Sequence, residues 1–201
     1  MTRSGSSRTV IVLTIEEGRV PSEVNMAKIL LHICCGPCAI YPVWALRGEG
    51  LAVHGFFYNP HIQPYLEFKK RLETLRFWAE SEELPLIVRS DYDPESFFRQ
   101  VAFRESQRCF YCYSLRLEAA ARLAKKSRFD AFTTTLLYSK RQKHELIVAI
   151  ATEAARKHGI DFLHRDFRVG WREGQQKALA LGLYRQQYCG CIYSEMERFH
   201  Q

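Results

Sequence analysis

The chain has 201 residues, enough for one domain with a full hydrophobic core. Apolar residues make up 47% and charged residues 25%, which excludes a disordered or fibrous protein, and no segment approaches the roughly 18 apolar residues of a membrane helix. The 29 Lys and Arg against 22 Asp and Glu give a formal net charge of +7, which favours a polyanionic partner such as a nucleic acid.

Residues 1–25 begin with Ser, Gly and Arg and show no helical period, so we expect an N-terminal extension in front of a single α/β domain at 26–201. The apolar run TVIVLTI in this extension is short, and acidic residues follow it instead of a small-residue cleavage site. We therefore expect a soluble, cytoplasmic protein without a signal peptide and without a membrane partner.

Predicted strands and helices alternate along the rest of the chain. In chain order they are a strand at 27–33, a helix at 36–48, a strand at 51–59, a helix at 64–83, a strand at 85–90, a helix that Asp93 caps, a helix at about 106–126, a strand at 131–137, a helix at 143–159 and a strand within 161–168. Repeated units of this kind predict a mostly parallel sheet with helices on both faces.

Three of the seven cysteines lie in HICCGPC, directly after the first predicted strand. Ligands of parallel α/β sheets bind beyond the carboxyl ends of the strands, so Cys34 and Cys35 occupy the usual ligand position. Cys38 follows at the start of a helix, where the dipole and free N–H groups are expected to lower its thiol pKa. Packing of both adjacent cysteines in one core is the alternative, but neighbours on a strand point to opposite faces.

Two further cysteine pairs follow. In RCFYCY, Cys109 and Cys112 stand three residues apart at the front of a predicted helix, so both thiolates can meet one metal or cluster. With the first group they favour a four-cysteine site for zinc or for an iron–sulfur cluster. In CGC, Cys189 and Cys191 are separated by one glycine, which is typical of a reducible couple, and two unrelated thiols near a helix start are the alternative.

Several motifs match one family in order and spacing. From about Lys28 to Glu197, the segments ICCGPC, FFYNP, RCFYCY, TTTLLYSKRQ and GQQKALALGLYRQQYCGCIYS resemble the cobalamin-independent epoxyqueuosine reductases of the QueH type. The resemblance implies a fold like that of the PP-loop, or HUP-like, nucleotide-binding α/β proteins. It implies reduction of the epoxide of epoxyqueuosine to queuosine at the wobble position of tRNA.

The resemblance also implies the roles of six cysteines and the partners. A [4Fe-4S] cluster would be held by Cys34, Cys35, Cys109 and Cys112. A redox-active disulfide would form between Cys189 and Cys191. The expected partners are a tRNA substrate and an electron donor that the sequence does not identify.

The residue types fit this chemistry. Conversion of an epoxide to an alkene takes two electrons and two protons with loss of water; a [4Fe-4S] cluster passes one electron at a time, whereas a dithiol passes two. Cys38 is a spare thiol, for which we expect a catalytic role. With Asp91 or Asp166 it is also a candidate ligand for a second iron.

We expect nucleic-acid contacts on the rim of the sheet that carries the thiols, after the second and fourth strands. A flipped wobble nucleotide could stack on an aromatic side chain there, with basic side chains on the flanking phosphates. The candidate residues are Tyr58, Asn59, His61, Tyr138, Lys140, Arg141 and Lys143.

Two alternatives belong to other functional classes. A PP-loop tRNA sulfurtransferase would share the fold and the thiols, but it needs a phosphate loop where this chain has Cys-Cys-Gly-Pro-Cys. A zinc-stabilised RNA-binding module would use the same four cysteines as structural ligands. Vicinal cysteines are unusual ligands of structural zinc, which disfavours this module.

Overall fold

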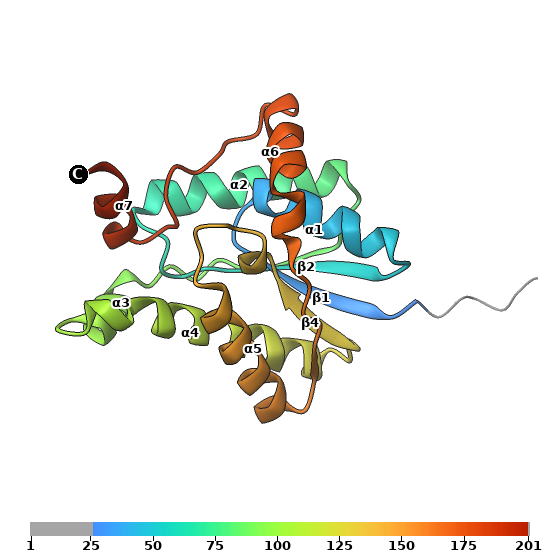
Figure 1. Ribbon diagram of the computed structural model, residues 1–201, viewed down its shortest axis with the longest axis horizontal. Coiled ribbons are helices and arrows are strands. Elements are labelled where there is room, and N and C mark those ends of the chain that lie inside the picture. Colours follow the sequence, from blue (N-terminus) through green and yellow to red (C-terminus); the bar gives the residue numbers. More distant parts are fainter. Residues whose placement is uncertain (1–25, 201) are drawn as a thin grey trace, which may run out of the picture.

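The computed structural model describes residues 26–200, so the extension expected at 1–25 lies outside the described residues. Five parallel strands form one sheet in the order β3-β2-β1-β4-β5 (Figure 1). The strands are β1 (Lys28–Ile33), β2 (Ala52–Tyr58), β3 (Leu86–Arg89), β4 (Ala131–Thr134) and β5 (Asp161–Phe162). The predicted parallel α/β sheet is therefore confirmed.

Helices cover both faces of this sheet (Figure 1). One face carries α1 (Gly36–Gly48), α2 (Tyr65–Ser81) and α6 (Trp171–Ala180). The other carries α3 (Pro94–Val101), α4 (Arg108–Lys126) and α5 (His144–His158), and a last short helix, α7 (Ile192–Phe199), lies at one end of the molecule. Among residues 26–200, no helix combines the length and the apolar character needed to cross a bilayer.

Local sequence explains these elements. Five consecutive residues of β1, Ile29–Ile33, are buried, because a central parallel strand is covered on both faces. The Asp93 carboxylate accepts a hydrogen bond of 3.0 Å from the Ser96 N–H and caps α3, as expected. Gly159 ends α5 in the left-handed conformation, with φ 63°.

Two predicted strands are shorter than expected. The strand predicted at 131–137 ends at Thr134, whose side chain accepts a hydrogen bond from the Leu136 N–H and starts a single 3₁₀ turn at Thr135–Leu137. The strand expected within 161–168 contains only Asp161 and Phe162, and the chain then turns into a second 3₁₀ segment at Phe167–Gly170.

The sheet order determines where the site lies. β1 is central, and β2 and β4 pair with it in parallel on either side, so their carboxyl ends meet at one edge. Cys34 and Cys35 follow β1, Asn59 follows β2 and Thr135 follows β4 at this edge. The predicted loop position of the vicinal cysteines is confirmed.

Candidate active site

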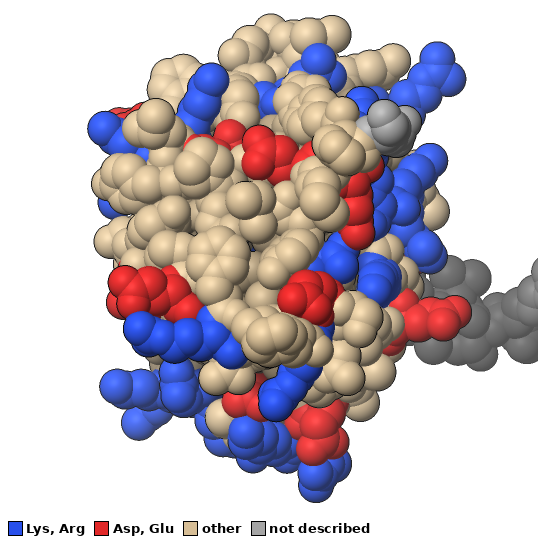
Figure 2. All heavy atoms as spheres, turned by 90° about the vertical axis from the view of Figure 1, so that its left-hand side faces the viewer, with Lys and Arg blue, Asp and Glu red and all other residues tan. Residues whose placement is uncertain are grey.

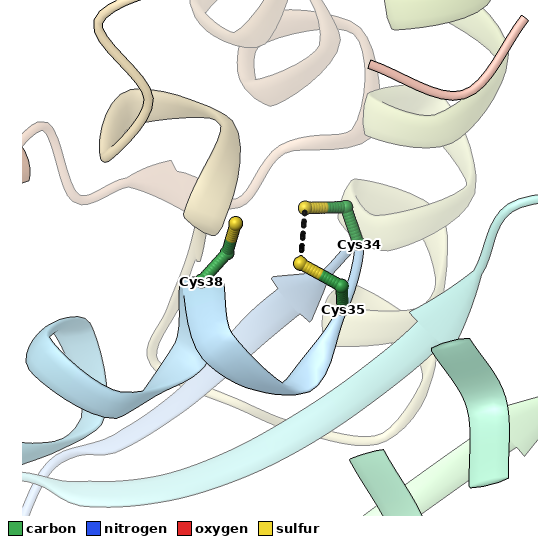
Figure 3. A group of neighbouring side chains, drawn as sticks. All are labelled: Cys34, Cys35 and Cys38. Atoms are coloured by element: carbon green, nitrogen blue, oxygen red, sulfur yellow. Dashed lines mark hydrogen bonds between the residues drawn. The ribbon is translucent and has the colours of Figure 1, made fainter. Parts of the chain in front are cut away.

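Three thiols form a compact group after β1. The sulfurs of Cys34, Cys35 and Cys38 all lie within 4.8 Å of one another, and those of Cys34 and Cys35 are 3.7 Å apart (Figure 3). Cys34 and Cys35 lie in the loop between β1 and α1, and Cys38 lies in the first turn of α1 (Figure 3). In the described part of the chain this is the one group of three or more potential metal-ligating side chains at such short range.

The three thiols have different pKa values. Hydrogen bonds from the Cys35 and Cys38 thiols and from the Thr135 hydroxyl hold the pKa of Cys34 well below its usual range. Burial raises the pKa of Cys35, and hydrogen bonding to Cys34 and Cys35 raises the pKa of Cys38. The expectation that the helix start lowers the pKa of Cys38 is therefore wrong, because the neighbouring thiols and burial outweigh the helix start.

A second group of thiols lines a small cavity of about 30 Å³. The group contains Cys109 and Cys112, from the first turns of α4, and Cys189 and Cys191, from the segment before α7. Burial raises the pKa of Cys112 to about 12. Each of the two cysteine pairs predicted from the sequence therefore faces the other across one cavity.

Arg116 connects this cavity to the first thiol group. Its Nη2 donates to Cys112 Sγ at 3.0 Å and its Nη1 to Asn59 Oδ1 at 3.4 Å. The Asn59 amide in turn donates to the carbonyl oxygen of Ile33, the residue before Cys34, at 2.8 Å. Arg116 is buried, and no carboxylate of residues 26–200 forms an ion pair with it. Its positive charge therefore faces sulfur and amide oxygen atoms.

The Arg71 side chain and the Gln63 main chain hold the C-x-C segment in place. Arg71, buried on α2 and paired with Glu67 at 2.6 Å, donates to the carbonyl oxygens of Cys189 at 2.7 Å and of Tyr188 at 3.1 Å. The Gln63 N–H donates to the carbonyl oxygen of Gly190 at 2.7 Å. Gly190 has φ 147°, and a Cβ there would lie 3.3 Å from Arg71 Nη1. Glycine is thus required between the two cysteines for this backbone path.

Cys189 belongs to the walls of two adjoining cavities, because it also lines a larger one together with Cys34 and Cys38. The four ligands predicted from the sequence are therefore divided: Cys34 and Cys35 lie in the compact group, and Cys109 and Cys112 lie across the small cavity from the C-x-C pair. All seven cysteines are free thiols in this structure. The assignment of cluster ligands and of the redox pair stays a prediction.

The carboxylates expected to assist Cys38 are engaged elsewhere. Asp91 pairs with Arg89 at 3.1 Å and Asp166 pairs with Arg168 at 2.7 Å. The three-thiol group contains no carboxylate. The second-iron hypothesis for Cys38 stays a prediction that this arrangement does not support.

The predicted nucleic-acid contacts divide into buried and exposed residues. The buried ones are Tyr58, Asn59, His61 and Tyr138, and the exposed ones are Lys140, Arg141 and Lys143. Asn59 and His61 line the small thiol cavity, and the Tyr138 ring packs against Trp171 at 5.0 Å. The four aromatic and polar residues are thus part of the buried packing around the site, and the three basic residues lie at the protein surface.

Sequence reasoning missed Arg116 and Arg71. Arg116 follows Cys112 by four positions on one helix, so the helical spacing alone predicts that the two side chains share a face. Arg71 is 118 residues from Cys189, and nothing in the local pattern of α2 indicates the contact.

The fold and the site together define a parallel α/β protein with thiols at the ligand edge of its sheet. Similar folds are found in U34-tRNA thiolase NcsA from Methanococcus maripaludis with its [4Fe-4S] cluster (TM-score 0.55, 12% identity, 85% of this chain and 62% of that chain). A predicted subunit of tRNA methyltransferase from Methanocaldococcus jannaschii is also similar (TM-score 0.54, 12% identity, 77% and 75%). At this identity the likeness concerns the fold alone.

Residues 29–197 match the family described as Epoxyqueuosine reductase QueH, and the chain belongs to this family. It is 36% identical over 172 residues to the Epoxyqueuosine reductase QueH of Dehalococcoides mccartyi, covering 86% of this chain and 94% of that protein. It is 35% identical over 184 residues to the protein of the same name from Thermotoga maritima, with 86% and 93% covered. The resemblance inferred from the motifs is confirmed, and the chain is an oxidoreductase of this family.

Proposed function

We propose that this protein reduces the epoxide of epoxyqueuosine in tRNA to the alkene of queuosine. The observation that carries the proposal is the convergence of cysteines from three distant chain segments at the carboxyl edge of the sheet, in a chain of this family. The formal charge of +7 and the exposed Lys140 and Arg141 at this edge suit a tRNA substrate.

Electron and proton counts are consistent with a dithiol reductant. When Cys189 and Cys191 form a disulfide, they release two electrons and two protons. The epoxide takes up both, both of its C–O bonds break, the oxygen leaves as water and the alkene remains. An external electron donor must then reduce the disulfide for the next turnover.

The donor set fits an iron–sulfur cluster, whose ligands are thiolates. We assign Cys34, Cys35, Cys109 and Cys112 as its ligands; Arg116 lies between these two pairs as a buried positive charge. A [4Fe-4S] cluster bound there would supply single electrons to the site. The hydrogen bonds that lower the pKa of Cys34 suit a thiolate ligand, and Cys35, whose pKa is raised, would lose its proton on binding.

Arg71 and Gln63 orient the reacting pair in this proposal. They bind the backbone carbonyl oxygens of Cys189 and Gly190, which leaves the thiols free to face the two cavities. Gln142 donates to Cys189 Sγ at 3.0 Å, a contact that stabilises a thiolate at this position. We infer that Cys38, whose raised pKa favours the protonated thiol, is a proton source beside the substrate.

Anaerobic turnover tests the proposal. The protein is purified without oxygen, analysed for iron and acid-labile sulfide, and incubated with epoxyqueuosine-containing RNA and a chemical reductant. We expect about four irons per chain and queuosine as the product, and we expect Cys189→Ser and Cys191→Ser each to abolish turnover while the iron is retained. Zinc without sulfide, together with RNA binding but no turnover, would instead favour the zinc-stabilised RNA-binding module.

A further inference from the structure

A polar cavity of about 260 Å³ opens beside the thiols. Its floor includes Cys34, Cys38 and Cys189. Four glutamines, three arginines and Trp171 are among its lining residues, and none of the lining residues is Asp or Glu. The cavity is smaller than the roughly 300 Å³ at which typical small-molecule pockets begin, so it suits one part of a larger ligand.

Two of the glutamines contact thiols. Gln186 Nε2 donates to Cys38 Sγ at 3.2 Å, and Gln142 Nε2 donates to Cys189 Sγ at 3.0 Å. The oxygen of Gln142 accepts a hydrogen bond from the Tyr113 hydroxyl at 2.5 Å, so both ends of that amide are satisfied. The oxygen of Gln186 is buried and has no hydrogen-bond partner among residues 26–200. A buried acceptor of this kind costs stability unless a ligand supplies the missing donor.

The other walls offer complementary groups. Trp171 is held against Tyr138, whose hydroxyl donates to the Trp171 carbonyl oxygen at 3.0 Å, so its ring is fixed at the wall. Arg141, Arg185 and Arg198 are exposed, and none forms an ion pair with a carboxylate of residues 26–200. The face seen in Figure 2 has a broad uncharged area, with Lys and Arg side chains around its margins and some Asp and Glu side chains among them.

We propose that this cavity receives the modified base of a flipped nucleotide, and that the Gln186 amide turns its buried Oε1 toward the cavity to accept a hydrogen bond from a hydroxyl or amino group of the substituent. Trp171 provides the stacking surface, and Arg185 and Arg198 bind the adjoining phosphates. The inference rests on the proposed function and extends it, because it names the residues that distinguish the modified base from an unmodified one. None of these four residues is a candidate site residue from the sequence.

The position of Gln186 explains why this amide matters. Its Nε2 contacts Cys38 and the residue lines the cavity, while its Oε1 is buried in the wall, so a substituent toward which the amide turns lies next to the thiols. The absence of acidic lining residues leaves amides and arginines as the recognition groups. Amides can pair with neutral polar groups, and the planar guanidinium groups match phosphate oxygens.

Binding measured apart from turnover tests the inference. The probes are two RNA stem-loops that differ only at the wobble position, one with epoxyqueuosine and one with guanosine, and no reductant is present. We expect Gln186→Leu to lower the preference for the modified RNA by about fivefold or more, the effect of one lost hydrogen bond. Gln186→Asn, which keeps the amide but shortens it, should give a partial loss.

Matched controls separate recognition from general damage. Gln176 is the control for Gln186. It is exposed on α6 and, unlike its neighbour Gln175, does not line the cavity, so Gln176→Leu should leave the preference for the modified RNA unchanged. The double variant Arg185→Ala with Arg198→Ala should weaken the binding of both RNAs equally. It should also reduce the slope of log binding constant against log salt concentration by about one unit or more, whereas Arg172→Ala on α6 should have little effect. Thermal unfolding and thiol titration verify that each variant is folded.

The possible results point in different directions. Loss of preference in folded Gln186 variants, with affinity for the guanosine RNA retained, supports the assignment. A wild-type preference in folded Gln186→Leu overturns it, and turnover by the wild-type protein would then leave the proposed function intact. A wild-type protein that neither prefers nor reduces the epoxyqueuosine RNA overturns both.

Discussion

Arg116 donates a hydrogen bond to Cys112 Sγ at 3.0 Å, and no carboxylate of residues 26–200 forms an ion pair with its guanidinium. A buried cation without a carboxylate partner is costly unless another anion is present. The thiolates of the site, and a cluster bound to them, would provide that negative charge. The buried charge of Arg116 on α4 should therefore affect the charge state and the reduction potential of the thiol site.

Removal of this charge should change the reduction potential of the reconstituted centre. We expect Arg116→Gln to lower the potential by about 60 mV or more, because a one-electron shift of about 59 mV corresponds to about 1.4 kcal/mol. Arg116→Lys should retain part of the effect. Arg99→Gln, an exposed change on α3, is the control and should leave the potential unchanged. Potentiometric titration monitored by absorbance measures the difference, and equal potentials in all variants would contradict it.

The Arg71–Glu67 pair should be more important to stability than a surface ion pair. Arg71→Met leaves the buried Glu67 carboxylate without its cation, so we expect a loss of about 3 to 5 kcal/mol in the free energy of unfolding. The double variant Arg71→Met with Glu67→Gln removes the stranded charge and should lose less. Denaturant unfolding compares the two, and an equal loss in both would show that the stranded charge is not the cause.

The same substitution should also loosen the C-x-C segment. Arg71 supplies hydrogen bonds to two consecutive carbonyl groups, at Tyr188 and Cys189. We expect limited proteolysis between residues 184 and 192 to be faster in the double variant than in wild type under native conditions. Unchanged cleavage there would mean that Gln63 and Gly190 alone hold the segment.

Close packing at the start of α6 depends on glycine. A Cβ at Gly170 would lie 2.1 Å from the Tyr41 ring, which belongs to α1. We expect Gly170→Ala to destabilise the protein by about 1 to 3 kcal/mol through overpacking. Gly48→Ala is the control, since a Cβ there meets nothing within 4 Å, and it should be neutral or stabilising by less than about 1 kcal/mol. Thermal unfolding of the two variants distinguishes these outcomes.

Acid should destabilise the protein through His61. Burial and the charge of Arg116 lower its pKa from 6.5 to about 4. Between these values the unfolded chain binds a proton that the folded chain does not, so stability falls as pH decreases, by about 1.4 kcal/mol per pH unit for this group. The pKa of His32 is lowered to about 4 as well, mainly by burial. His32 therefore adds a further loss of stability as the pH decreases.

A variant isolates the contribution of His61. Its ring packs between Phe97 and Tyr111, and its Nδ1 has no hydrogen-bond partner, so His61→Phe fits the site without losing a bond at that atom. Urea unfolding at pH 7 and at pH 5 should show a smaller loss of stability on acidification in His61→Phe than in wild type. Identical losses would mean that other groups determine the acid sensitivity.

Much of the fold could be predicted from the sequence because its signals are local. The buried run of β1, the Asp93 cap and Gly159 act through neighbouring residues, and each lies where the pattern indicates. The end of β4 could not be predicted, because TTTLL has strong strand propensity and only the Thr134 side chain, bonded to the Leu136 N–H, starts the turn.

The site was predicted in composition but not in detail. Spacing identified all three cysteine segments, since their residue types carry the chemistry. It could not show that the pKa of Cys34 is the lowered one, because this depends on how Cys35 and Cys38 are placed around Cys34 in the folded loop and on a further hydrogen bond from Thr135, which is 101 residues away. Nor could it show that Tyr58 and Tyr138 are buried, since residues at the ends of strands can face either the core or the rim.

The cysteine segments are attached to parts of the fold that differ in how easily they open. Cys34 and Cys35 follow the central strand β1, which pairs with a strand on each side and is covered by helices. Exchange of the β1 amides with deuterium therefore requires unfolding of the sheet. Cys189 and Cys191 lie outside any strand and are held by Arg71 and Gln63. Opening of their segment would break these contacts and none of the hydrogen bonds of the sheet, so the C-x-C thiols would become accessible at a lower cost in free energy than Cys34 and Cys35.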